Sequence, residues 1–167
     1  MRNRNGSRGV TLVELCFGLA VIAILAGLAV PSMRAALRNG AVRSATLDLL
    51  AGVQQTRASS ILEARPATLC LSDRAGRCLR GNAPAPAWNA FLERDGETRT
   101  LTRRLLPAGI EIRASRARLD FWPYAMAAST NTLTICDTQG LGRPRALVIS
   151  QTGRVRVEDA DREACGA

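Results

Sequence analysis

The chain has 167 residues, which is enough for one compact domain and too few for two ordinary ones. Its 23 basic residues are all arginine, against 14 acidic residues, so the net charge is +9, and lysine and histidine are absent. P-loop nucleotide hydrolysis, Schiff-base chemistry and most triad or zinc hydrolases need a lysine or an imidazole. We therefore expect a protein that is not an enzyme and that uses no cofactor or metal.

The first 30 residues predict a membrane anchor. Residues 1–9 are polar and carry three arginines, and residues 10–30 are apolar except for Glu14. About 20 apolar residues in a helix cover the roughly 30 Å hydrocarbon core of a bilayer. The arginines before this run favour a cytoplasmic amino terminus, which places the rest of the chain across the membrane. The run does not end in the small residues of a secretory cleavage site, so we expect the anchor to stay attached.

Glu14 is the unusual residue of this segment. A carboxylate inside an apolar membrane helix costs roughly 2.5 kcal/mol or more unless it finds a cationic partner. The sequence therefore predicts that a cationic group neutralises Glu14.

The residues around Glu14 resemble the class III leader of type IV pilins and pseudopilins. Gly9 is followed by the run VTLVEL, and Pro31 falls where pilin helices commonly kink, although Val10 stands where the family usually has phenylalanine. The resemblance implies that residues 1–9 are a leader, that prepilin peptidase cleaves between Gly9 and Val10, and that the new amino terminus is methylated. It also implies that this amine neutralises Glu14 of a neighbouring subunit. The alternative is a plain single-pass anchor that uses none of this machinery.

The resemblance also implies where the protein works. Pilins are held in the inner membrane by a single helix, with the amino terminus in the cytoplasm and the globular domain in the periplasm, and they become extracellular on assembly into a pilus. The implied partners are prepilin peptidase, other major and minor pilins and, before assembly, the inner membrane.

Residues 31–65 predict a continuation of the same helix. The segment is rich in alanine, leucine and arginine, and its apolar residues recur near helical spacing until Pro66 marks a stop. Gly40 and Gly52 are weak points at which we expect modest bends. The apolar residues expected to pack against the globular domain are Leu49, Val53, Ile61 and Leu62.

Residues 66–167 predict a β-rich globular domain, because short apolar runs are divided by glycine, proline and asparagine. We expect a loop at residues 81–87. The expected strands span residues 67–71, 88–92, 109–113, 118–121, 132–136, 145–150 and 154–157. The few aromatic residues are scattered, which favours core and loop anchors over a base-stacking platform; they are Trp88, Phe91, Phe121, Trp122 and Tyr124.

The five cysteines contain no CxxC pair and have no histidine to complete a tetrahedral site, which argues against zinc. In an oxidising compartment the four distal cysteines form two disulfides, for which three connectivities are possible. We favour the pairing of Cys70 with Cys78 and of Cys136 with Cys165.

Several stretches of the globular part resemble the FimT/GspH branch of the pseudopilins. These stretches are residues 70–78, 106–112, 133–150 and 153–156. The resemblance implies an α+β, pilin-like fold in which a long amino-terminal helix packs on antiparallel sheet. FimT-like minor pilins of this branch are associated with DNA binding during natural transformation through a GRxR motif. That motif here consists of Gly153, Arg154, Val155 and Arg156.

Four arginines are the candidate DNA-binding residues. Residues two apart on a strand share a face and stand about 6.6 Å apart, so Arg154 and Arg156 are spaced to meet neighbouring phosphates. The preceding hairpin carries Arg143 and Arg145. If the sheet pairs these segments, the four arginines form one compact patch. We expect such a patch to bind the backbone of double-stranded DNA without regard to sequence, and salt to weaken this binding steeply.

Two observations weigh against a single patch. Acidic residues follow the motif directly and can pair with the four candidate arginines, which would lower the attraction for DNA; they are Glu158, Asp159, Asp161 and Glu163. A separate arginine cluster is either a second patch or a solvated strand face. It comprises Arg103, Arg104, Arg113, Arg116 and Arg118.

The sequence leaves three functions open. The first, favoured by the basic charge and the GRVR motif, is a minor type IV pilin that takes part in pilus assembly and binds extracellular DNA during uptake. The second is a GspH-like minor pseudopilin of a type II secretion system. The third is a purely structural subunit that primes the pilus and does not bind DNA.

Overall fold

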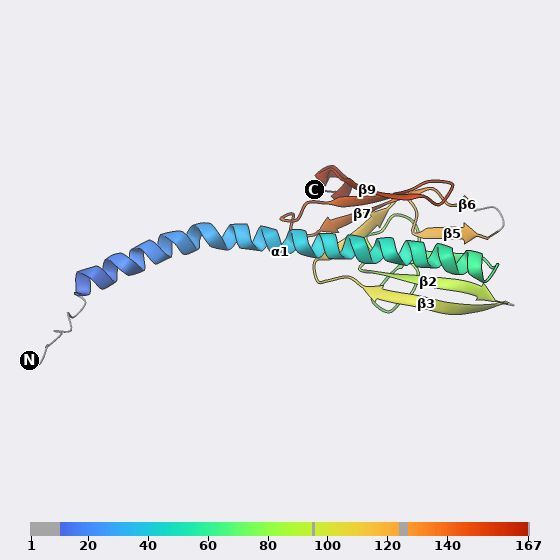
Figure 1. Ribbon diagram of the computed structural model, residues 1–167, viewed down its shortest axis with the longest axis horizontal. Coiled ribbons are helices and arrows are strands. Elements are labelled where there is room, and N and C mark those ends of the chain that lie inside the picture. The colour runs from blue at the N-terminus through green and yellow to red at the C-terminus, as the bar shows by residue number, and fades with distance from the viewer. Residues whose placement is uncertain (1–10, 95, 124–126, 167) are drawn as a thin grey trace, which may run out of the picture.

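The computed structural model describes residues 11–94, 96–123 and 127–166. One long helix, α1 (Leu12–Leu62), extends as a free stalk over residues 12–37 and then packs along a β-rich domain (Figure 1). This order of elements confirms the expected α+β fold. Gly9, Val10 and Tyr124, together with the rest of the proposed leader, lie outside the described residues.

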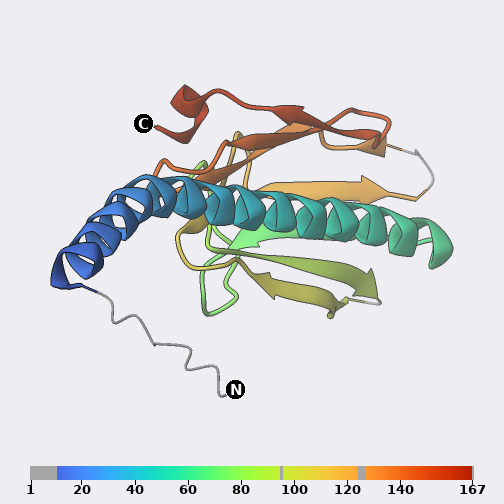
Figure 2. The same ribbon diagram turned by 60° about the vertical axis from the view of Figure 1, so that its left-hand side comes forward.

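Helix α1 begins where the sequence offers a capping residue. Thr11 has an extended backbone, and its Oγ1 accepts a hydrogen bond from the backbone N–H of Glu14 at 3.3 Å. The helix continues through Pro31, which lacks the N–H that its turn would use. Figure 2 shows the stalk curving away from the axis of the packed half, as a proline inside a helix favours.

The carboxyl end of α1 comes at Leu62, earlier than the predicted residue 65. Ala64 adopts a left-handed backbone with φ 52°, and the N–H of Arg65 donates back to the carbonyl of Ser60 at 3.1 Å. The Ser60 hydroxyl closes the turn by donating to the carbonyl of Arg65 at 2.7 Å. The helix therefore ends in a left-handed cap before it reaches Pro66.

The strands form two antiparallel sheets in the described part of the chain. They are β1 (Ala67–Ser72), β2 (Ala87–Arg94), β3 (Glu97–Leu105), β4 (Ile110–Ala114), β5 (Arg118–Trp122), β6 (Ala127–Ala128), β7 (Asn131–Asp137), β8 (Arg145–Ile149) and β9 (Val155–Asp159). One sheet has the order β3-β2-β1-β5-β6 and the other the order β4-β7-β8-β9. A short 3₁₀ turn, η1 (Arg162–Cys165), ends the described chain. Both sheets lie against the packed half of α1; in Figure 1, β2 and β3 appear below the helix, and β5 and β6 of the same sheet appear above it with β7 and β9 of the other.

All seven expected strands are present with small shifts at their ends, and β3 and β6 were not expected. β3 is exposed along nearly its whole length and shows no apolar alternation, so its sequence carries no strand signal. Its hydrogen bonds to β2 hold it at the edge of the sheet. In the expected loop at 81–87, Ala85 forms an isolated bridge with Ile112 and Ala87 already belongs to β2.

The core lies between α1 and the two sheets. Leu49 and Val53 are fully buried there, as expected, whereas Ile61 and Leu62 are 47% and 84% exposed and the expectation for them is wrong. In this last turn Ser60 is the residue that faces the sheet, where its hydroxyl donates to the carbonyl of Phe121 at 3.2 Å, so the neighbouring Ile61 and Leu62 point away from the core. The aromatic anchors in the core are Trp88 and Phe121, while Trp122 is half-exposed and Phe91 half-buried.

Gly52 of α1 is required by the Trp88 ring. A Cβ at Gly52 would stand 2.1 Å from Cη2 of Trp88, which is far inside van der Waals contact. The indole of β2 therefore packs directly on the helix backbone, and Gly52 sets the depth at which α1 settles on the five-stranded sheet.

An ion pair between Arg38 and Asp137 connects α1 to the four-stranded sheet. The Asp137 side chain is fully buried, and it accepts hydrogen bonds from Nε of Arg38 at 2.9 Å and from Nη2 of the same guanidinium. It also accepts three backbone N–H groups, from Gln139, Leu141 and Gly142 at 3.1, 3.1 and 2.8 Å. Burial alone would raise the pKa of Asp137, but the hydrogen bond from Arg38 and the backbone donors outweigh it and lower the pKa.

Two disulfides close the domain, with the favoured connectivity. Cys70 of β1 joins Cys78, and Cys136 of β7 joins Cys165 in η1. The second bridge ties the end of the described chain to β7. Cys16, in the stalk, is a free thiol.

Candidate functional site

The stalk is the first candidate site, because its apolar side chains contact nothing in the monomer. Every side chain described between residues 11 and 34 is exposed, and α1 is long and apolar enough there to cross a membrane. Glu14 is the only charged residue between Leu12 and Met33. It lies in the first helical turn, where the helix dipole favours a carboxylate. An exposed apolar rod with one carboxylate at its end is suited to a bilayer or to the packed interior of a filament.

The turn of the GRVR motif is the second candidate site. It joins β8 to β9, and the N–H of Gly153 donates to the carbonyl of Ser150 at 2.8 Å. Gly153 has φ +73°, and Arg57 of α1 donates from Nη1 to the Gly153 carbonyl at 3.3 Å. A Cβ at Gly153 would stand 2.9 Å from Nε of Arg57. The motif needs glycine both for its backbone conformation and for the close approach of Arg57.

Arg57 and Arg154 consequently lie on one hollow of about 430 Å³ between α1 and the turn. Its apolar lining includes Val53, Ile61 and Val155. Within the described residues, neither Arg57 nor Arg154 has an ion-pair partner. The two guanidinium groups thus form a cationic pair with no acidic neighbour to neutralise it; we call it the turn pair.

Arg145 and Arg156 are neutralised by the acidic residues that follow the motif. Nε of Arg156 lies 2.6 Å from Oε1 of Glu158, and Nε of Arg145 lies 3.2 Å from Oδ1 of Asp159. The expected pairing of acids with the four candidate arginines is therefore confirmed for Glu158 and Asp159. No such pair is recorded for Asp161 or Glu163 in the described chain.

The expectation of one compact patch is wrong, because the register of β8 and β9 separates the arginines. Arg145 stands opposite Asp159, on the face that carries the buried Leu147, whereas Arg156 stands opposite Val148 on the other face. Alternation along a strand thus points Arg145 and Arg156 in opposite directions.

Arg143 and Arg145 instead meet another part of α1. The backbone N–H of Arg143 donates to Oδ1 of Asn39 at 2.7 Å, and both arginines line a hollow of about 330 Å³ that also includes Arg43. Arg43 and Arg57 are about 21 Å apart along the helix, at 1.5 Å per residue. The basic groups therefore form two separate sites at opposite ends of the β8–β9 hairpin.

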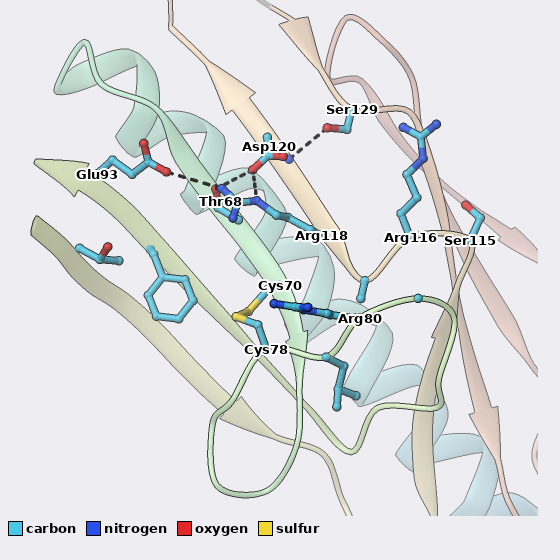
Figure 3. A pocket seen from close by; sticks show the side chains of 15 residues that line it. Thr68, Cys70, Cys78, Arg80, Glu93, Ser115, Arg116, Arg118, Asp120 and Ser129 are labelled. Carbon is cyan, nitrogen blue, oxygen red and sulfur yellow. Dashed lines mark hydrogen bonds and ion pairs between the residues drawn. A yellow bond between two sulfur atoms is a disulfide. The ribbon is translucent and has the colours of Figure 1, made fainter. Parts of the chain in front are cut away.

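The second arginine cluster is also divided. Arg113 of β4 pairs with Glu111 at 2.8 Å, and Arg103 of β3 donates from Nη2 to the Arg74 carbonyl at 2.6 Å. Arg116 and Arg118 line a groove on the five-stranded sheet, which Figure 3 shows. The expected cluster is thus divided among three surfaces: one at Arg113, one at Arg103, and the groove that Arg116 and Arg118 line. Arg104 takes part in none of these contacts.

The sequence patterns do not single out Arg43, Arg57 or Arg80 as site residues. Arg43 and Arg57 are separated by nearly four helical turns and so share one face of α1, which is a signal that the sequence does contain. That this face meets the ends of the β8–β9 hairpin follows only from how the helix docks. Arg80 lies in an irregular loop and has no periodicity to mark it.

Comparison with known proteins supports the fold. The family model of the type II transport protein GspH matches residues 45–153. Two crystal structures of the type IV minor pilin FimU from Pseudomonas aeruginosa strain PAO1 are similar in fold, with TM-scores of 0.53 and 0.54 and identities of 19% and 18%. Each match covers 70% of this chain, and 87% and 91% of the respective FimU chain. No curated protein matches this chain.

The family model spans more than half of the chain, from residue 45 in the packed half of α1 to Gly153, the first residue of the GRVR motif. The FimU structures share the arrangement of a long helix on antiparallel sheet. The chain therefore belongs to the GspH family and is a pilin-like protein of the minor pilin and pseudopilin type.

Proposed function

We propose that the chain is a minor type IV pilin that takes part in pilus assembly and contacts extracellular double-stranded DNA during uptake in natural transformation. The observation that carries the assembly role is the stalk, whose exposed apolar side chains need a bilayer or neighbouring helices to cover them. Before assembly the stalk holds the protein in the inner membrane, with its amino terminus in the cytoplasm and the sheet domain in the periplasm.

Prepilin peptidase then removes residues 1–9 by cleavage between Gly9 and Val10 and methylates the new amino terminus. The carboxylate of Glu14, exposed at the start of α1, accepts this amine from an adjoining subunit in the filament. Such a pair explains why a lone carboxylate persists in an apolar helix.

Assembly is tested by replacing Glu14 with leucine in cells that carry the filament machinery. We expect the variant to stay in the membrane fraction and to be lost from sheared filaments, while the control Glu163→Gln, which removes a surface carboxylate of the sheet domain, enters filaments normally. Mass spectrometry of the extracted protein should show loss of residues 1–9. Normal entry of the Glu14→Leu variant into filaments, or an intact leader, would contradict the proposal.

DNA contact rests on the turn pair. Arg57 and Arg154 are uncompensated and lie on one hollow, so two guanidinium groups are available to neighbouring phosphates. Arg143, beside Arg43, offers a second contact at the other end of the hairpin. These contacts reach the DNA backbone only, so binding is independent of sequence and is weakened by salt. Removal of the leader takes three arginines and no acids, so the mature chain remains basic.

DNA contact is tested by titrating the full chain, held in detergent micelles, with labelled duplex DNA at several salt concentrations. We expect the double variant Arg57→Gln/Arg154→Gln to bind about tenfold more weakly and to show a flatter salt dependence. The control Arg74→Gln/Arg104→Gln removes the same charge from exposed arginines outside the turn pair. Equal weakening in both double variants would show that binding follows net charge alone.

The neutralised arginines favour a second candidate. Because Arg145 and Arg156 are already paired with acids, two of the four predicted DNA contacts are weakened. A purely structural role follows if the unmodified protein fails to bind DNA at low salt, either as a pilus-priming subunit or as a GspH-like pseudopilin of a type II secretion system. Incorporation into a type IV pilus would then indicate the first role, and incorporation into the filament of a type II secretion system the second.

A further inference from the structure

A basic groove of about 740 Å³ lies on the five-stranded sheet, on the face turned away from α1. Leu69 and Leu71 of β1 pack into the core with the helix, so the alternate residues Thr68 and Cys70 point to the opposite face. This volume is typical of sites that hold small ligands or short chain segments. The groove shares no lining residue with the turn pair, so it is a separate site.

Two loops form the walls of the groove. One is the segment after the Cys70–Cys78 disulfide, which carries Arg80, and the other is the turn between β4 and β5, which carries Arg116. Figure 3 shows the Arg80 side chain reaching toward the disulfide and Arg116 on the opposite loop. The disulfide thus holds one wall of the groove against the sheet.

The charge of the groove comes from Arg80 and Arg116. A third arginine, Arg118, is neutralised within the groove by Asp120 at 2.7 Å and by Glu93 at 3.5 Å. Neither Arg80 nor Arg116 has an ion-pair partner among the described residues, and both are exposed. Guanidinium groups bind phosphate oxygens in a bidentate fork. Figure 3 shows Arg80 directed at the disulfide and Arg116 directed toward Ser129, so the two arginines can contact different phosphates of one strand.

The remaining lining is apolar and aromatic. Phe91 of β2 is half-buried beside Thr68, its partner across the β1–β2 ladder, and Leu79 adds apolar surface from the loop. Ser129 lies at the far side of the groove and accepts the N–H of Asp120 at 3.2 Å, which leaves its hydroxyl proton to donate. An aromatic face beside unpaired arginines is the combination that binds single-stranded nucleic acid, because bases stack on the ring while the backbone follows the cations.

We infer that this groove binds a single strand of nucleic acid, with different phosphates of the strand contacted by Arg80 and Arg116 and a base stacked on Phe91. The groove has no lining residue in common with the hollow of the turn pair. The site is therefore distinct from the proposed duplex contact at Arg57 and Arg154, and it suits the unpaired end of a DNA fragment.

The test measures the fluorescence anisotropy of a labelled short oligothymidylate added to the full chain in detergent micelles at low salt. We expect Arg80→Gln/Arg116→Gln to weaken binding about tenfold, while Arg74→Gln/Arg104→Gln, with the same loss of charge outside the groove, weakens it less than about twofold. No binding by the unmodified protein, or equal weakening in the two double variants, would overturn the inference.

Phe91 separates stacking from charge. We expect Phe91→Leu to weaken oligothymidylate binding about fivefold or more and Phe91→Tyr to retain it, because tyrosine keeps the aromatic face. Circular dichroism checks that both variants keep the fold. Equal binding by the leucine and tyrosine variants would overturn the stacking role and with it the assignment to nucleic acid.

Two competitors test the ligand class. Duplex DNA that fills the turn pair should displace little of the oligothymidylate, and polyglutamate at equal charge should displace less than unlabelled oligothymidylate. Displacement by polyglutamate as effective as that by the oligonucleotide would show a general anion site instead. The double variant Arg57→Gln/Arg154→Gln should keep its affinity for the single strand, so failure of the duplex proposal is observed independently of this one.

Discussion

Arg38 in α1 and Asp137 at the end of β7 form an ion pair across 99 residues of sequence, and the Asp137 carboxylate is fully buried within it. The same guanidinium donates to the carbonyls of Ala108 and Gly109, at 3.0 and 2.9 Å. Helix, β7 and the loop before β4 therefore meet at one charged group. This joint decides how the stalk is held relative to the sheets.

Replacing Asp137 with asparagine should destabilise the domain by about 3 kcal/mol, because a buried guanidinium loses its counter-charge. Urea unfolding of the detergent-solubilised chain, followed by the fluorescence of the buried Trp88, measures the change. The control Asp48→Asn removes an exposed carboxylate of α1 and should shift stability by less than about 0.5 kcal/mol. Similar losses in both variants would contradict the role of the joint.

The acid stability of the protein should depend on the same carboxylate. The pKa of Asp137 is lowered from its ordinary value of 3.8, so the folded state stabilises the ionised carboxylate relative to the unfolded state. Its contribution is complete at neutral pH and is lost as the pH falls below 3.8 and through the lowered pKa. Across this pH window, the free energy of unfolding should fall more steeply with decreasing pH for the unmodified protein than for Asp137→Asn. Parallel curves would contradict the prediction.

Replacing Gly153 with alanine should destabilise the domain by about 1 to 2 kcal/mol through its left-handed backbone alone. The close approach of Arg57 adds to this cost. Gly140→Ala is a matched control, because Gly140 has φ +69° but nothing within 4 Å of an added Cβ. The excess loss in Gly153→Ala over Gly140→Ala, measured by thermal unfolding, isolates the contact with Arg57. Equal losses would show that Arg57 moves aside freely.

Ala64 offers a stabilising substitution. It holds φ 52° at the end of α1, a conformation that glycine adopts without a Cβ clash, so Ala64→Gly should stabilise the domain by about 0.5 to 1 kcal/mol. Ala58→Gly, in the exposed interior of the same helix, should instead destabilise by about 1 kcal/mol. A loss of stability in Ala64→Gly would show that the left-handed cap is not strained.

Local patterns were sufficient to predict the helix, seven strands and the pairing of the cysteines. The apolar run after residue 9 and the stop near Pro66 are each defined by residues that are adjacent in the sequence, so composition and periodicity are sufficient to predict them. β3 was missed because its strand is defined by hydrogen bonds to β2 and not by burial of its own side chains. Ile61 and Leu62 were misjudged because apolar spacing does not show which side of the last turn faces the sheet, a place that Ser60 takes.

The candidate site was predicted less well, because it depends on register and docking. Arg145 and Arg156 belong to opposite faces only once β8 and β9 are paired as Val148 with Arg156. Arg57 joins Arg154 only once Gly52 and Trp88 have set the position of the helix. The contact of Arg57 with Gly153 connects residues 96 positions apart, and nothing in the neighbouring sequence of either partner specifies it.

The joint at Arg38 also has a mechanical meaning. Arg38 is the first residue along α1 that hydrogen-bonds to the sheet domain among the residues described, and the 26 or so residues before it run free as one rod of about 39 Å at 1.5 Å per residue. Tension or torque applied to the far end of that rod reaches the domain through a single guanidinium before it reaches the apolar core. A load carried from the rod into the sheet domain is therefore met first at Arg38.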